Sequence, residues 1–570
     1  MFTRTRCILA LALIAPALAI ALVGVVSPAP VAAAASPILI QTEQGIPITS
    51  PEVRAACGSC HVPDAEGRMS RISYRRATPE NWELTIKRML ALNNAALTPE
   101  QARVVLKYLA DNLGLAPEEA KPVMGIAEQR LDDFTYTGDA PTHNLCNACH
   151  TVGRVLNERR TPEEWGLLIS MHRGVYPGID GGSGGFRGRG GAAATANAKQ
   201  PMDLAVEHLS KAFPLSSAEW AAWSAAKSPA RLAGRWAVTG YQTGLGPVYG
   251  EVVVAAMPGA ADTFTTTTTL TYAKTGKTVK LAGRSLVYTG FQWRGRSSEA
   301  PDSAEVWREV AMVSRDQNEV TGRWFTGAYA ETGMDLTLRR VAGPVVSGAD
   351  LAAVKTGTTG TTLKIYGANL PLKLTAADVS AGQGVSVTAV VSSTATMATV
   401  TVDVAGDARI GPRDLIVAGA ARPAALVVYS KVDGVRVRPR TGLARVGGDP
   451  HPKQFQQFEA VAFSNGVDGK VDTADDLLLG LVDAKWSLEE YSATFVEDDL
   501  KYVGAISQTG FFTPSMEGPN PERSGNRNNI GDVYVVADYA PAGGAAVRGR
   551  AHLLVTAPLY MFWSSTEVGK

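Results

Sequence analysis

No cysteine follows Cys149 in this chain of 570 residues, so no cofactor can be attached through cysteine anywhere in the remaining three quarters. Beyond residue 228 the chain holds only two histidines, His451 and His552, and shows neither a metal-binding cluster nor a Ser, His and Asp order of a hydrolase. Neither sign of charge dominates: 55 basic residues balance 54 acidic ones, which excludes a global field that would attract nucleic acid or an anionic membrane. Function therefore has to be sought in local sites.

Long apolar runs are also missing after the first residues of the chain. A basic start at Arg4 and Arg6, an apolar run over 8–26 and the small residues of 33–36 have the layout of a cleavable secretory signal. A retained membrane anchor is the alternative, but Pro16 and Gly24 interrupt the run. We expect residues 1–35 to be removed and the mature protein to be exported.

The cysteines that remain after this cleavage form two identical patterns. Each pair is spaced Cys-x-x-Cys and followed at once by histidine, which is the pattern of covalent haem attachment. The residues are Cys57, Cys60 and His61, then Cys146, Cys149 and His150. A redox dithiol and a zinc site are the two alternative interpretations of such cysteine pairs. A redox dithiol requires neither the histidine that follows nor a second copy of the motif. The sequence predicts two c-type haems with His61 and His150 as proximal ligands.

A repeat in the sequence suggests the ligands on the opposite side of each haem. Thr-Pro-Glu-Asn-Trp over 78–82 returns as Thr-Pro-Glu-Glu-Trp over 161–165, an offset of 83 residues. Both segments should begin helices, with threonine as N-cap and proline in the first turn. The same offset aligns Met89 with His172. Since methionine and histidine are common distal haem ligands, we predict the pairs His61/Met89 and His150/His172.

Other residues compete for these two roles. Met89 could instead be a core residue of an amphipathic helix with Leu84, Ile86 and Leu90. The competing ligands are Met69 and Met124 for the first haem, and Met171, Met202, His143 and His208 for the second.

The pattern of the chain predicts helices around the haems and strands beyond them. Further helices are expected from Thr98 to Leu113 and from about Met202 to Phe213, whereas the Gly- and Arg-rich insertion at 181–200 is expected to be a surface loop. After residue 228, short alternating runs rich in Val, Thr and Gly indicate β-structure. The expected domains are a signal peptide (1–35), cytochrome c modules for haem 1 (36–120) and haem 2 (121–228), an antiparallel β-barrel (229–343), an immunoglobulin-like β domain (344–428) and a C-terminal β-sandwich (429–570). The fold class is thus a helical tandem di-haem region followed by three antiparallel β domains.

Three local expectations follow in the β region. Strands are expected at Phe264–Tyr272, Ser285–Trp293, Glu305–Val313 and Met334–Leu338. The segment Thr275-Gly276-Lys277-Thr278 ends like a phosphate-binding loop but lacks its first glycine, so it is expected to be a hairpin turn. Asp468, Asp472, Asp475 and Asp476 miss the EF-hand spacing, which favours a solvated acidic loop over a calcium site.

A signal peptide, two Cys-x-x-Cys-His sites with these ligand pairs and three β domains in series resemble the alpha subunit of quinohaemoprotein amine dehydrogenase. The resemblance spans the mature chain and implies a periplasmic oxidoreductase subunit that relays electrons. In that family a small gamma subunit carries a cysteine tryptophylquinone, which primary amines reduce, and packs with a propeller-like beta subunit. The implied acceptor is a soluble blue-copper protein or cytochrome c. The quinone cannot be in this chain, because every mature cysteine is committed to haem.

Two alternatives from other classes remain at this stage. A di-haem peroxidase would do chemistry at its own iron and needs an open or displaceable sixth position. A non-catalytic haem sensor or scaffold would account for the β domains but not for two haem sites.

Overall fold

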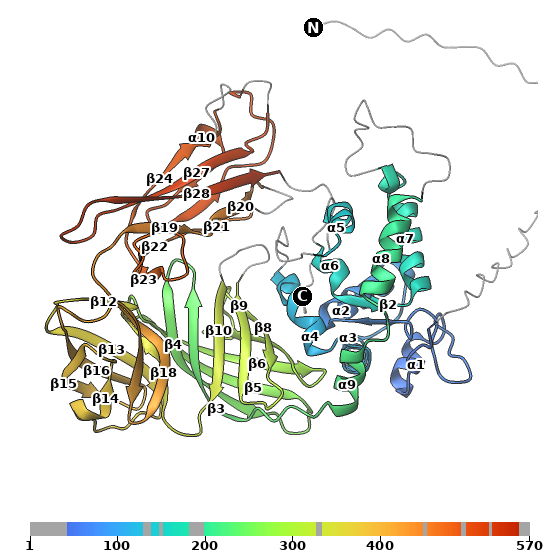
Figure 1. The fold of residues 1–570 in the computed structure, drawn as a ribbon. Helices are drawn as coiled ribbons and strands as arrows, with labels where there is room; N and C mark the ends of the chain where they lie inside the picture. The colour runs from blue at the N-terminus through green and yellow to red at the C-terminus, as the bar shows by residue number, and fades with distance from the viewer. Residues whose placement is uncertain are drawn as a thin grey trace, which may run out of the picture. The chain divides into compact units, whose positions relative to one another are not determined.

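The computed structural model describes residues 43–128, 138–147, 152–181, 199–326, 333–448, 453–491, 498–523 and 527–557. The predicted signal peptide lies outside these residues, and so does most of the Gly- and Arg-rich insertion. Helices dominate up to Ala226, and strands dominate from Gly234 onward (Figure 1). Within the described ranges, no helix combines the length and apolar character needed to span a bilayer.

The described residues up to Ala226 form helices and two very short strands. The elements are α1 (Pro51–Cys57), β1 (Arg75–Ala77), α2 (Pro79–Asn93), α3 (Pro99–Asn112), α4 (Pro117–Ala120), η1 (Lys121–Glu128), α5 (Ala140–Asn147), α6 (Gly153–Leu156), β2 (Glu158–Arg160), α7 (Pro162–Val175), η2 (Ile179–Gly181), α8 (Pro201–Ala212) and α9 (Ala218–Ala226).

The helix starts predicted from the Thr-Pro pairs are confirmed. Thr78 caps α2 and Thr161 caps α7, each accepting a hydrogen bond from the backbone N–H three residues later. Thr98 caps α3, where Gln101 completes a reciprocal capping box. Each cap satisfies a backbone donor that the helix leaves unpaired, and the proline that follows has no N–H to satisfy.

The two repeats meet at the antiparallel pair of β1 and β2. Arg76 lies opposite Arg159, and these two positions are related by the 83-residue offset, so the strand pair has an approximate two-fold axis at this point. The same symmetry appears in the hydrogen bonds: the N–H of Thr78 donates to Asn157 O at 3.1 Å, and the N–H of Thr161 donates to Tyr74 O at 3.3 Å. The repeat found in the sequence is thus also a structural repeat.

The repeated tryptophans hold equivalent places in the two halves. Trp82 Nε1 donates to Leu113 O at 2.9 Å, and Trp165 Nε1 donates to Phe213 O at 3.2 Å. Both carbonyls belong to residues that cap the end of the next long helix, α3 or α8. Both indole rings are buried, so each tryptophan locks the helix carrying a predicted distal ligand to its neighbour.

Eight strands close into a barrel after the helices, as predicted. They are β3 (Gly234–Gln242), β4 (Gly246–Ala256), β5 (Thr263–Tyr272), β6 (Thr278–Tyr288), β7 (Gln292–Ser298), β8 (Trp307–Val313), β9 (Glu319–Phe325) and β10 (Gly333–Arg340), all paired antiparallel. Closure leaves no free sheet edge. The predicted hairpin at 275–278 is confirmed: Gly276 has a φ of 71°, and its N–H donates to Tyr272 O at 2.8 Å.

One predicted barrel strand is wrong. Ser285–Trp293 is not continuous but contains the turn between β6 and β7. Thr289 and Gly290 have φ angles of 57° and 76° there, a conformation that ends a strand and that residues other than glycine rarely adopt. The residues around the turn are apolar, so the sequence pattern predicted one continuous strand there.

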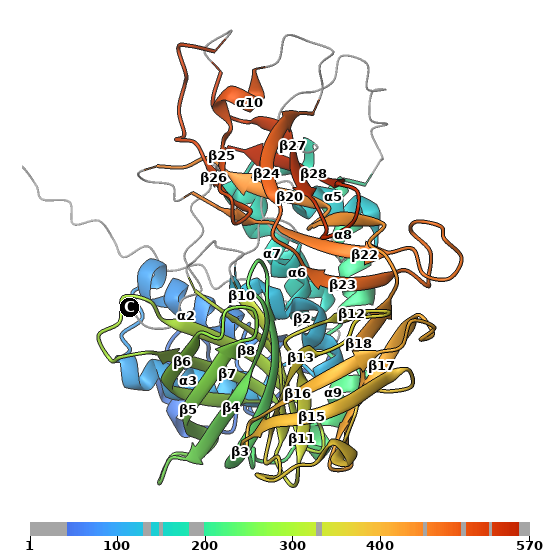
Figure 2. The same cartoon turned by 90° about the vertical axis from the view of Figure 1, so that its left-hand side faces the viewer.

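The next domain consists of two four-stranded sheets, β11-β13-β16-β15 and β12-β18-β17-β14. Its elements are β11 (Val345–Ala349), β12 (Ala353–Lys355), β13 (Thr361–Ala368), η3 (Ala376–Asp378), β14 (Val379–Ser380), β15 (Val385–Ser393), β16 (Met397–Val404), β17 (Gly411–Val417) and β18 (Ala420–Tyr429). Strands β13, β15 and β16 run side by side in Figure 2. A buried apolar core between the sheets, including Leu363, Val400 and Leu415, gives a β-sandwich.

The last described domain has sheets β19-β22-β23, β20-β28-β27-β24 and β21-β26-β25 around one core. Its elements are β19 (Gly434–Arg438), β20 (Thr441–Arg445), β21 (Gln456–Gln457), β22 (Glu459–Ser464), β23 (Leu477–Leu481), β24 (Lys485–Glu490), α10 (Asp499–Tyr502), β25 (Gly504–Ile506), β26 (Phe511–Pro514), β27 (Gly531–Tyr539) and β28 (Val547–Thr556).

The expectation of purely antiparallel sheets is wrong for both of these domains. In each domain, the first strand lies in one sheet and the second strand lies in another. This second strand runs parallel to the last strand of the domain: β12 pairs with β18, and β20 pairs with β28. Each of these first two strands is thus an edge strand of its sheet. Sequence alternation does not reveal strand direction, so this feature was missed.

The barrel also supports the helices that carry the candidate site. Arg294 of β7 forms a partly buried ion pair with Glu80 in the first turn of α2. Thr289 donates from its N–H to Asp111 Oδ1 at 2.6 Å and from its hydroxyl to Ala110 O at 2.8 Å, both on α3. Burial acts to raise the pKa of Glu80, but Arg294 outweighs it and holds that pKa below its usual range. The start of α2 and the end of α3 are therefore fixed on the barrel.

Candidate haem-binding cavity

A cavity of about 1950 Å³ opens among the helices and is lined by both repeats. Pockets for drug-sized ligands measure about 300–1,000 Å³, so this cavity has room for more than one such group. Of the predicted haem ligands and attachment sites, those on its wall are Cys57, Cys60, His61, Met89, Cys146 and His172. Cys149 and His150 lie outside the described residues.

The first attachment motif forms the end of α1 and the turn that follows. Backbone N–H groups of Cys60 and His61 both donate to Cys57 O, at 3.3 and 2.9 Å. This turn presents both thiols and the imidazole to the same cavity. Burial raises the pKa of the Cys57 thiol, with Cys60 adding to the effect. The nucleophilic cysteine of a redox dithiol has a lowered pKa instead, so the surroundings of Cys57 disfavour that alternative.

His61 has the hydrogen bond expected of a metal-binding histidine. Its Nδ1 lies 2.9 Å from Ser70 O. A carbonyl oxygen can only accept, so Nδ1 carries the proton and Nε2 keeps a free lone pair. Burial lowers the pKa of His61, which keeps the ring neutral. The residue can therefore act as a proximal ligand through Nε2.

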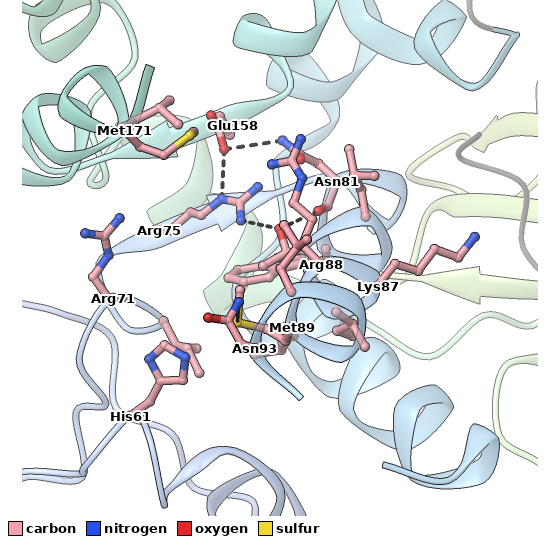
Figure 3. Close-up of a pocket in the computed structure, with 18 of the residues that line it drawn as sticks. His61, Arg71, Arg75, Asn81, Lys87, Arg88, Met89, Asn93, Glu158 and Met171 are labelled. Atoms are coloured by element: carbon pink, nitrogen blue, oxygen red, sulfur yellow. Dashed lines mark hydrogen bonds and ion pairs between the residues drawn. The ribbon is translucent and has the colours of Figure 1, made fainter. Parts of the chain in front are cut away.

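Met89 projects from α2 into the cavity, on which His61 also opens (Figure 3). It is only half-buried and does not belong to the core formed by its buried neighbours, among them Trp82 and Ile86. Asn93, one turn later, places its side-chain Nδ2 at 3.7 Å from Met89 Sδ. A thioether sulfur has lone pairs for both a hydrogen bond and a metal. Met89 thus has the exposure and chemistry of a ligand.

The two competitors of Met89 do not line the cavity. Met69 is fully buried in the apolar core shared by α1, α2 and α3. Met124 packs against Val310 and Phe325 of the barrel. Both side chains are occupied by apolar packing, which accounts for a methionine at those positions without a ligand role.

His172 lies on α7 and lines the cavity from the second repeat. Its Nδ1 is 2.8 Å from Leu168 O, one turn earlier in the same helix, so Nε2 is again left with its lone pair. Of its competitors, Met171 and Met202 also line the cavity, whereas His143 and His208 do not. Met171 is 47% exposed, and Met202 is buried.

A group of buried charges at the seam of the two repeats was missed in the sequence. Arg75, Glu158 and Arg160 all come from β1 or β2 and all line the cavity. Burial lowers the pKa of Arg75 to about 10. Burial acts to raise the pKa of Glu158, but the two arginines outweigh it and hold that pKa below its usual range. A signal did exist, because a pair of adjacent arginines lies just before Thr78-Pro79 and again just before Thr161-Pro162.

The aspartates of the acidic loop at 468–476 pair with other groups of the same domain. Asp472 accepts hydrogen bonds from Arg436 and Arg440 at 3.1 and 2.8 Å, and Asp476 pairs with Arg436. The carboxylate of Asp475 accepts from the backbone N–H of Asp468 at 3.1 Å. In the described parts of the chain, no three or more His, Cys, Asp or Glu side chains converge as a metal site.

The residues at the cavity fit haem by their chemistry. Thiols for covalent attachment, imidazoles with free Nε2 atoms and a thioether with an accessible sulfur are the donors used by c-type cytochromes. The buried Nε of Arg160 has no hydrogen-bond partner among the described residues, and an anionic group of a bound cofactor would satisfy it.

Comparison with protein-family models gave four matches. Residues 49–191 match "Quinohemoprotein amine dehydrogenase A, alpha subunit, haem binding". Residues 229–341, 350–430 and 435–568 match domains II, III and IV of the quinohemoprotein amine dehydrogenase alpha subunit. A search of curated proteins found no match.

Solved structures show only weak likeness. A redesigned beta barrel is 14% identical over 19% of this chain and 90% of its own, with a TM-score of 0.17. The mouse clustered protocadherin fragment PcdhgC3 EC1-3 is 12% identical over 45% of this chain and 77% of its own, with a TM-score of 0.15. The tandem Ig repeats of Dlar are 11% identical over 38% of this chain and 99% of their own, with a TM-score of 0.12.

Proposed function

Because this chain belongs to the family of quinohaemoprotein amine dehydrogenase alpha subunits, we propose that it is the di-haem electron-transfer subunit of a periplasmic amine dehydrogenase. The observation that carries the proposal lies within the haem-binding match: His61 and Met89 open on one cavity beside two cysteines spaced for haem attachment. His172 opens on the same cavity from the second repeat.

We propose two covalent haems with the following protein groups. Cys57 and Cys60 tether the first, and His61 and Met89 bind it axially. Cys146 and Cys149 tether the second, and His150 and His172 bind it axially. When bound, haem supplies reversible one-electron chemistry. The chain's own part is to fix each ligand: Ser70 O and Leu168 O orient His61 and His172, while Asn93 steadies the Met89 sulfur.

The amine itself is oxidised on a partner in this proposal. The family relation suggests a cysteine tryptophylquinone on a small gamma subunit, packed with a propeller-like beta subunit and with this chain. All four cysteines after the predicted signal peptide are assigned to haem, which leaves none for a quinone. Primary amines would reduce the quinone, and a soluble blue-copper protein or cytochrome c would receive the electrons from the haems.

The ligand pairs predict a direction for electron flow within the chain. Methionine ligation raises the reduction potential of a haem relative to histidine ligation. Electrons are therefore expected to pass from the bis-histidine haem to the His61/Met89 haem. Burial and hydrogen bonding around each ligand also tune the two potentials.

The test is reduction of the haems by amine, followed by absorbance in the purified complex and in this chain alone. Adding a primary amine should reduce both haems only when the small partner subunits are present. Reduction of the isolated chain by amine would contradict the assignment of the quinone to a partner. Peroxide turnover by the isolated chain would instead support the di-haem peroxidase.

Asn93 offers a finer prediction about the Met89 ligand. Asn93→Ala removes the amide that donates to Met89 Sδ at 3.7 Å, so the sulfur loses a partner that fixes its orientation. We expect a weakened sulfur-to-iron charge-transfer band and a shifted midpoint potential for one haem only.

Asn94→Gly is the neighbouring control for this variant. Asn94 ends α2 in the left-handed conformation, with a φ of 51° that glycine adopts without strain. Its replacement should keep both the spectrum and the potentials of the wild type. Equal spectra for Asn93→Ala and the wild type would refute the role of the amide.

A further inference from the structure

Three buried charged side chains lie where the repeats meet: two arginines donate to the same oxygen of one glutamate. Glu158 Oε2 accepts from Arg75 Nε at 2.8 Å and from Arg160 Nη2 at 2.9 Å. Arg75 and Arg160 are direct partners in the β1–β2 register. Figure 3 shows Arg75 joined to Glu158 above the level of Met89 and His61. We call these three residues the seam triad.

The seam triad is short of negative charge. Two guanidinium groups face one carboxylate, and all three residues are more than nine-tenths buried. The ion pair of Glu164 with Arg71 lies beside the triad and does not supply the missing negative charge. Glu164 is 3.1 Å from Arg71 and 3.6 Å from Arg160. These three arginines and two glutamates carry one net positive charge, of which Arg71, with a side chain 45% exposed, is partly solvated. The buried guanidinium groups of Arg75 and Arg160 still share the single carboxylate of Glu158, which favours a further anionic partner on the cavity side.

An unused donor points to where that partner binds. Arg160 Nε is buried and has no hydrogen-bond partner among the described residues. Leaving a charged donor unpaired in the interior is costly. Arg160 and Arg75 both line the cavity, and the planar fork of a guanidinium matches a carboxylate. A carboxylate that enters from the cavity would satisfy this donor.

We infer that Arg75 and Arg160 bind the carboxylate side chains of the haems and that the seam triad thereby sets the reduction potentials of both. The inference rests on the proposed function, since haem supplies these carboxylates. The triad belongs to both repeats at once, so one group of charges acts on both haems. Positive charge near a haem favours its reduced state, and negative charge favours its oxidised state. The two arginines raise the potentials, and Glu158 opposes them.

The test is spectroelectrochemical titration of the full-length chain carrying neutral substitutions. Arg75→Gln and Arg160→Gln should each lower the haem midpoint potentials, whereas Glu158→Gln should raise them. Arg160→Lys keeps the charge and should give a smaller shift than Arg160→Gln. Arg235→Gln is the control, because it removes the same charge from a surface ion pair with Glu251 on the barrel, and it should leave both potentials unchanged.

Opposite shifts separate an electrostatic role from a structural one. Damage to the seam would shift the potentials in the same direction for all three neutral variants, and that result would overturn the inference. Unchanged potentials in both arginine variants would overturn it as well. A solute anion in place of the haem carboxylates would make the wild-type potentials depend on phosphate concentration, a dependence that contradicts our assignment.

Failure of this inference differs from failure of the proposed function. If the proposed function is wrong, either the wild-type chain carries no covalent haem, which its mass shows before any titration, or it carries haems that amine does not reduce in the complex. If only the inference is wrong, two haems are present and their potentials ignore the triad. The lysine variant provides a second measurement if a glutamine variant does not fold.

Discussion

Replacing Met89 with leucine is expected to lower the midpoint potential of one haem strongly and to leave the midpoint potential of the other haem unchanged. Leucine has a similar size and keeps the apolar character of the site, so α2 should still form. What is lost is the thioether sulfur, the ligand type that raises the potential of a c-type haem. The sulfur-to-iron charge-transfer band should disappear in the same variant. Absorbance spectra and redox titration of the purified chain would measure both effects.

Met171→Leu is the matched control for this substitution. Met171 lines the same cavity and is 47% exposed, and it is adjacent to His172 in the sequence. If Met89 is the ligand, Met171→Leu should keep the wild-type spectrum. Loss of the charge-transfer band in Met171→Leu, with Met89→Leu unaffected, would show that the methionine ligand comes from the second repeat.

Removing both cysteines of the first motif is expected to have the largest effect on function. The double variant Cys57→Ala and Cys60→Ala should be exported with one covalent haem instead of two, because thioether bonds require the thiols. Cys57 is half-buried and Cys60 is exposed, so their loss should cost little folding stability. Transfer of electrons from amine to an external acceptor should fall to background, since the proposed exit haem is lost.

Cys7→Ala provides the control for the double variant. Cys7 lies in the predicted signal peptide, so its loss should change neither the haem content nor electron transfer. Mass spectrometry and haem staining of the exported protein measure the haem content of both variants. Two covalent haems in the double variant would contradict the assignment of Cys57 and Cys60.

The sequence predicted best what is decided over a few neighbouring residues. Threonine before proline marks a helix start through local hydrogen bonds, and the starts at Thr78, Thr98 and Thr161 were all correct. The barrel was predicted because its strands alternate regularly and most of them end in recognisable turns, the turn at Thr289 and Gly290 being the exception. The repeat also brought Met89 and His172 to attention, and both line one cavity.

Features that depend on distant residues were not predictable in the same way. The parallel pairs β12–β18 and β20–β28 join the beginning of a domain to its end, and alternation contains no information about direction. The seam triad joins Arg75 to Glu158, 83 positions away. The orientation of His61 and His172 was missed for a different reason: the acceptors, Ser70 O and Leu168 O, are near in sequence but belong to the backbone, which no side-chain pattern marks.

The symmetry of the helical region helps to explain why two unlike ligand sets would occur in one subunit. The β1–β2 pair relates the repeats around Arg76 and Arg159. Glu119 accepts hydrogen bonds from both of these buried arginines, at 2.8 Å from Arg76 and 3.2 Å from Arg159. A shared carboxylate holds the two halves together, while Met89 and His172 differ on the cavity side. Similar frames with different ligands would give two haems of different potential within one chain.

The mass of the intact exported protein tests the central claim most directly. We predict the mass of the processed polypeptide plus two haem groups, with both haems retained after denaturation because thioether bonds hold them. A mass equal to that of the bare processed polypeptide would contradict the account. Disulfide bonds between Cys57 and Cys60 and between Cys146 and Cys149 would contradict it equally.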